Sequence, residues 1–117
     1  MSSWPGFDMR REVRPDAIWL LVAGELDIGQ AERLEAEIAE AAASGRTLIV
    51  DLTGVTFCDS SGLAALLRAK RAHAAMRYAP GDAVVDVAKL GCVDDVLFAA
   101  APAVDASRLP ADDAASQ

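Results

Sequence analysis

Aromatic residues are scarce in this chain, at 5% of 117 residues, so the core must be built from Ala, Val, Leu and Ile. Cysteine is nearly missing as well: Cys58 and Cys92 lie far apart, and no Cys-x-x-Cys pair exists. The single histidine, His73, cannot complete a common zinc site. We therefore expect both cysteines to be buried as small hydrophobic residues, and we expect no metal or other cofactor.

Positive charge is in the minority, with 11 Lys and Arg against 18 Asp and Glu and a formal net charge of −7. An acidic surface repels phosphate backbones, which disfavours direct nucleic-acid binding. Long uncharged apolar runs are also missing, so we expect no transmembrane helix and no membrane insertion. The first residues lack the basic stretch and apolar run of a secretory signal, and we expect a cytoplasmic location.

The chain is long enough for one domain, and its predicted strands and helices alternate. Hydrophobic residues make up 53% of it. The order β-β-α-β-α-β-α-β predicts an α/β fold with a mixed, mostly parallel sheet and helices mainly on one face. We expect an N-terminal extension over 1–6, the domain over 7–104 and a flexible tail over 105–117.

Strands are predicted by apolar runs bounded by turn signals, and helices by apolar spacings of three and four. The first helix should begin at Ile28, with Ile28 on its inward face, and end before a left-handed Gly45. The strand that follows should end at a Thr53-Gly54 turn, and the second helix should begin near Ser60 or Ser61. The expected strands are 7–13, 17–23, 47–52 and 76–79, with a further edge strand over 93–98, and a third helix spans 82–90.

The most informative stretch runs from Leu48 to Leu63, where a buried strand leads into Asp59-Ser60-Ser61-Gly62. These polar residues stand at the start of a helix, where free N–H groups and the helix dipole favour an anion. A serine at such a place can be a nucleophile, a helix cap or a residue that accepts a phosphate.

A nucleophile is disfavoured by the spacing of the motif. A Gly-x-Ser-x-Gly elbow needs small residues two positions either side of the serine, but Asp59 and Leu63 flank Ser61. His73 lies about 18 Å further along the same predicted helix, too far to act as its general base. A cap accounts for one of the three polar residues. A phosphate on Ser61 would be tolerated at the helix start and would change a docking surface there.

Two segments resemble the STAS domain of bacterial anti-sigma factor antagonists. One is Gly24-Glu25-Leu26-Asp27, and the other is Val50 to Leu63, which contains Asp-Ser-Ser-Gly-Leu. The stretch from Gly91 to Phe98 is similar to the ending of the family's domain. The resemblance covers the chain from about Phe7 to Ala100 and implies a STAS-like single domain.

The resemblance implies a switch without catalysis by this chain. An anti-sigma factor that is also a serine kinase would phosphorylate Ser61. The unphosphorylated domain would bind that kinase and free a sigma factor, and a phosphatase would restore binding. Residues expected at the partner surface are Asp27, Asp59, Ser60, Gly62, Ala64 and Arg68.

An alternative within the same fold is an accessory subunit of a lipid-transporting ABC system, which would dock on the ATPase through the same helix. The chain also departs from the family pattern over Arg71–Ala79, which is several residues short. We expect a stunted fourth strand or an early end of the second helix there. Trp4 is expected to be loosely packed or to serve as an interaction anchor.

Overall fold

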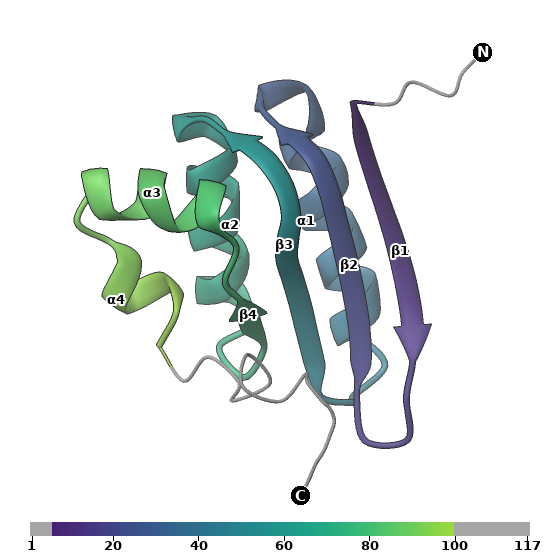
Figure 1. Ribbon diagram of the computed structural model, residues 1–117. Coiled ribbons are helices and arrows are strands. Elements are labelled where there is room, and N and C mark those ends of the chain that lie inside the picture. The colour runs from purple at the N-terminus through teal and green to yellow at the C-terminus, as the bar shows by residue number, and fades with distance from the viewer. Residues whose placement is uncertain (1–5, 100–117) are drawn as a thin grey trace, which may run out of the picture.

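The structure is a computed structural model that describes residues 6–99. Trp4, most of the expected extension and the expected tail lie outside the described residues. The elements, shown in Figure 1, are β1 (Phe7–Val13), β2 (Ile18–Leu26), α1 (Ile28–Ala42), β3 (Leu48–Cys58), α2 (Ser60–Ala72), β4 (Arg77–Ala79), α3 (Asp82–Leu90) and α4 (Asp94–Leu97).

The sheet has the strand order β1-β2-β3-β4. The β1 and β2 strands are antiparallel, whereas β2 and β3, and β3 and β4, are parallel. Figure 1 shows α1 and α2 side by side against one face of the sheet, with α3 and α4 beyond α2 at the β4 edge. The predicted mixed α/β fold with helices mainly on one face is confirmed. Its core is aliphatic and includes Leu20, Leu34, Ile38, Val50, Leu52 and Leu66, none of which is exposed.

The two central strands are longer than their apolar runs predicted. The predicted end at Ala23 is wrong, because β2 passes through Gly24 (φ +99°) to Leu26. The predicted Thr53-Gly54 turn is also wrong, because β3 continues to Cys58. Register shifts after Leu21 and Gly24 let the two strands stay paired beyond these glycines. The extra residues place the strand ends at Leu26 and Cys58, directly before Asp27 and Asp59.

Two other expectations need correction. The stretch 93–98 is not an edge strand: it forms the short helix α4, which places Leu97 in the core. Cys92 is exposed at a left-handed backbone position (φ 58°), so only Cys58 is a buried cysteine. The end of α1 agrees better, since the helix stops at Ala42 and Gly45 is left-handed (φ +79°).

The fourth strand is stunted, as the short segment after α2 predicted, with only three residues. It is held to α2 by two polar contacts. The Tyr78 hydroxyl donates to the Leu66 carbonyl at 2.8 Å, and Lys70 Nζ donates to the Met76 carbonyl at 2.5 Å. Burial, with a smaller contribution from Arg77, lowers the pKa of Lys70. The short strand is therefore anchored through its side chains and flanking backbone to the helix that carries the candidate site.

Tyr78→Phe is expected to lower the free energy of unfolding by about 1–2 kcal/mol at neutral pH, because it removes a buried hydrogen bond. Burial, with a smaller contribution from Glu35, raises the pKa of Tyr78 above its ordinary 10.0. The unfolded chain therefore loses this proton first, and wild-type stability is retained below about pH 10 and lost as the pH rises further. Urea denaturation of both proteins between about pH 7 and pH 11 checks this. An equal alkaline loss in Tyr78→Phe would contradict it.

Candidate functional site

The candidate site lies where β2 and β3 end side by side. Leu26 and Cys58 are paired in the parallel register, and each is followed by an aspartate that caps a helix. The Asp27 carboxylate accepts from Gly29 N at 3.0 Å at the start of α1, and the Asp59 carboxylate accepts from Gly62 N at 2.8 Å at the start of α2. The prediction that both aspartates reach the same end of the sheet is confirmed.

Capping by Asp59 leaves the two serines of the motif available for another role. Ser60 is exposed and Ser61 is half-buried, and they are the first two residues of α2. Asp59 is engaged by the amide of Gly62, and the Asp59 carbonyl accepts the first helical bond from Leu63 N at 2.9 Å. Within residues 6–99, the backbone N–H groups of Ser60 and Ser61 have no hydrogen-bond partner. The first N–H groups of a helix have no acceptor within the helix, so they can bind an anion at its N-terminus.

Gly62 is buried rather than presented on the surface. A Cβ atom at this position would lie 2.5 Å from the Leu26 carbonyl oxygen and 3.1 Å from Cys58 Sγ. The glycine therefore lets α2 start directly against the ends of β2 and β3. Its role in the site is to set where Ser61 lies.

A groove between α1 and α2 runs from Ser61 along the second helix. It has a volume of about 490 Å³. On the α2 side, the groove is lined by Ser61 and Ala64 near the start of the helix and by Arg68 at its far end. The lining residues are Ile28, Ala31, Glu32, Ser61, Ala64 and Arg68. The structure thus brings three of the predicted site residues, Ser61, Ala64 and Arg68, into one groove.

Arg68 also connects the two helices. Its Nε and Nη2 atoms donate to the two carboxylate oxygens of Glu35 at 3.0 and 3.1 Å. The hydrogen bond and the charge of Glu35 raise the pKa of Arg68. The Arg68 side chain remains 54% exposed, so this bidentate pair stands at the solvent edge of the groove.

The sequence pattern predicted the wrong position for Ile28 on α1. It was expected on the inward face of α1, but it is 76% exposed and lines the groove. The buried face of α1 begins one turn later, at Ala31. Ile28 is the first residue of the helix and lies outside the part of α1 that packs on the core. Glu32 and Glu35 were likewise not predicted as site residues. Their spacing of three along the chain was a usable signal for a shared helix face.

The Cys58 thiol lies next to the motif and is held in its protonated form. Burial raises the pKa of the Cys58 thiol to about 11, and the neighbouring Asp59 carboxylate adds to the shift. A thiol with a raised pKa is a poor nucleophile at neutral pH. No group of three or more His, Cys, Asp or Glu in residues 6–99 is arranged to hold a metal ion.

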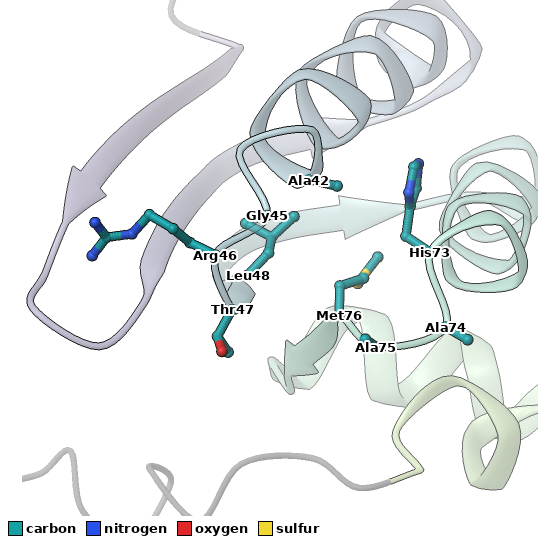
Figure 2. A pocket seen from close by; sticks show the side chains of 9 residues that line it. All are labelled: Ala42, Gly45, Arg46, Thr47, Leu48, His73, Ala74, Ala75 and Met76. Atoms are coloured by element: carbon teal, nitrogen blue, oxygen red, sulfur yellow. The ribbon is translucent and has the colours of Figure 1, made fainter.

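His73 stands at the opposite end of α2, where its backbone caps the helix. There it borders a separate cavity of about 400 Å³ between the ends of α1 and α2 (Figure 2). Leu48 and Met76 supply apolar surface to this cavity, while the side chain of Arg46 points away from it. The Arg46 guanidinium donates instead to the carbonyls of Arg14 and Pro15. Among the described residues, therefore, no histidine lies near Ser61.

The sequence also matches a family model over residues 9–97, more than half of the chain, and that model describes the "Mlab, STAS domain". The chain belongs to the STAS domain family. No curated protein sequence is significantly similar to it.

Several solved structures are similar to this STAS domain. An anti-sigma factor antagonist from Mycobacterium paratuberculosis is 25% identical with a TM-score of 0.71, over 89% of this chain and 93% of that one. The unphosphorylated anti-sigma factor antagonist SpoIIAA is 27% identical with a TM-score of 0.55, over 74% of this chain and 83% of that one. The phosphorylated form of the Bacillus cell fate determinant SpoIIAA is 26% identical with a TM-score of 0.53, over 72% and 83%. The STAS domain thus has the fold of anti-sigma factor antagonists.

Of the helices within residues 6–99, none combines the length and the apolar character that crossing a bilayer requires.

Proposed function

We propose that this STAS domain is an anti-sigma factor antagonist, a phosphorylation-switched module that binds an anti-sigma factor with serine kinase activity and thereby frees a sigma factor. One observation carries the proposal. Ser61 is the second residue of α2 and lines an open groove, while Asp59 already caps the helix. Ser61 is therefore available for modification without loss of the cap.

A phosphate on Ser61 is compatible with the fold. In the step we propose, Ser61 Oγ attacks the γ-phosphorus of ATP bound to the kinase. The new O–P bond replaces the bond to the leaving ADP, and the serine proton passes to the kinase. The unpaired N–H groups of Ser60 and Ser61 and the helix dipole then favour the added negative charge. A phosphatase that hydrolyses the O–P bond returns Ser61 to its original state.

The partner surface that we propose surrounds Ser61 on the early turns of α2. Ala64 and Arg68 continue it along the groove, and Ile28 adds an exposed apolar side chain from α1. Ser60 and the two capping aspartates, Asp27 and Asp59, border the same strand ends. An apolar anchor beside a charged rim is typical of a specific protein interface. Adding about −1.5 to −2 charges at its centre opposes docking.

This proposal makes the domain a binding protein rather than an enzyme, and it requires no cofactor in this chain. The position of His73 at the opposite end of α2 supports it, since among the described residues no histidine lies near Ser61. The anti-sigma factor antagonists among the similar structures support the same partner class. They do not favour the accessory-subunit alternative, which would dock on an ATPase without phosphorylation.

Incubation with the cognate anti-sigma kinase and ATP is expected to add one phosphate group to the protein, measured by intact mass. Ser61→Ala should gain none, and Ser60→Ala, a matched control one residue away, should gain one. Phosphate on Ser61→Ala would place the modification elsewhere. An unchanged mass of the wild-type protein with an active cognate kinase would contradict the proposed switch.

A further inference from the structure

We propose that phosphorylation of Ser61 transfers the guanidinium group of Arg68 from Glu35 to the phosphate. The ion pair that now links α1 to α2 would then be replaced by one within α2. This inference rests on the proposed function, because it requires a phosphate on Ser61. It adds a binding residue for that phosphate and a change in the groove that follows from it.

The helix geometry places Arg68 in line with Ser61. Seven residues separate them, which corresponds to about 10.5 Å along the axis and to faces that differ by about 20°. Long side chains on a helix lean toward its N-terminus, which is the direction of Ser61 from Arg68. A phosphoserine side chain extends from the other end. The two long side chains together can span the two turns.

On α2, the small side chain of Ala64 lies between the two groups, and Ser61, Ala64 and Arg68 all line the same groove. On the α1 side the lining consists of Ile28, Ala31 and the acidic Glu32. Because the Arg68 side chain is 54% exposed, its guanidinium can move without breaking buried packing.

The exchange is favoured by charge. Glu35 offers Arg68 a single negative charge, whereas a phosphoserine carries about −1.5 to −2 and three acceptor oxygens. Both groups accept the two parallel N–H bonds that an arginine provides. An exposed ion pair is weak and salt-sensitive, so the existing Glu35 contact is readily given up for a stronger one.

The transfer changes the groove beyond the phosphate itself. In the present structure Arg68 neutralises Glu35, and Glu32 is the acid of α1 that lines the groove. Once Arg68 pairs with the phosphate, Glu35 loses its partner, and the charges of Glu32 and Glu35 are both left uncompensated beside the groove. A partner that fits the neutral Glu35–Arg68 pair then meets an acidic surface on both helices.

The test uses full-length protein with phosphoserine installed at position 61 by genetic encoding, so that it does not depend on a kinase. A ³¹P NMR titration measures the second pKa of the phosphate. Arg68→Gln is expected to raise this pKa by about half a unit over wild type, because a nearby cation favours the dianion. Glu35→Gln should lower it further, because it frees Arg68 from its competitor. The acids Asp27, Glu32 and Asp59 near the site are unchanged in every variant.

Arg71→Gln is the matched control, since Arg71 is exposed on the same helix outside the groove lining, and it should leave the pKa unchanged. The proposal is overturned if Arg68→Gln and Arg71→Gln give the same pKa as wild type. As a second measurement, the ¹⁵N-resolved signal of Arg68 Nε–H should shift on phosphorylation of the wild-type protein, and an unmoved signal would also overturn it. Failure here leaves the proposed function standing, since that function is tested separately by phosphate uptake at Ser61 and by the effect of a charge at Ser61 on kinase binding.

Discussion

Ser61→Asp is expected to weaken binding of the cognate anti-sigma kinase by at least about 100-fold, which corresponds to about 2.7 kcal/mol. The physical reason is that Ser61 lines the groove between α1 and α2. A fixed charge there must be desolvated when a partner covers the groove, and it stands close to Asp59. Isothermal titration calorimetry with the purified kinase measures the change.

The fold should survive this substitution. An acid in the first turn of a helix is favoured by about 0.3–1 kcal/mol, which offsets repulsion from the capping Asp59. Ser61→Asn, which has nearly the same size without the charge, is the matched control and should retain most of the affinity. Ser61→Ala should also bind. If Ser61→Asp binds as tightly as wild type, or if Ser61→Asn loses as much affinity, the charge switch is refuted.

Gly62→Ala is expected to lower the free energy of unfolding by about 3 kcal/mol. The added Cβ would lie 2.5 Å from the Leu26 carbonyl oxygen and 2.9 Å from Leu26 Cγ. A backbone carbonyl cannot turn aside as a flexible side chain does. The start of α2 must therefore move away from β2, and Ser61 moves with it. Chemical denaturation measures the loss.

The pseudo-equivalent position at the start of α1 supplies a matched control. Gly29 follows the capping Asp27, and its only contact for a new Cβ is the Asp27 carboxylate at 3.3 Å. Gly29→Ala should be neutral or stabilise the protein by up to about 1 kcal/mol through helix propensity. If both substitutions change stability equally, close approach at Gly62 is not the cause. A binding defect in Gly62→Ala beyond its unfolded fraction would support the role of Gly62 in placing Ser61.

Local chemistry was enough to predict the elements that position the site. Asp59 followed by small polar residues predicted a cap and the start of α2, because an aspartate side chain satisfies the free N–H groups of a helix. The shared position of Asp27 and Asp59 followed from parallel strands that end at one edge of the sheet. The short connection after α2 correctly predicted a stunted strand.

Strand length could not be predicted locally. The Thr53-Gly54 pair is typical of a turn, and the Asp51 carboxylate does accept from Thr53 N at 2.9 Å and from its hydroxyl at 2.6 Å. Pairing with β2 nevertheless carries β3 through this point. The ladder continues because the register shifts keep both strands bonded, which is a property of two segments far apart in the sequence.

The sequence by itself determined the alternation of strands and helices, a cap within Asp59-Ser60-Ser61 and the serine at the helix start, since each depends on neighbours within a few residues. Only the tertiary structure decided which side chains share the groove. Ile28 is exposed because α1 begins before its buried contacts do. Glu35 meets Arg68, 33 residues further along the chain, because their two helices pack together. Contacts of this kind depend on how whole elements are placed, and no local pattern encodes them.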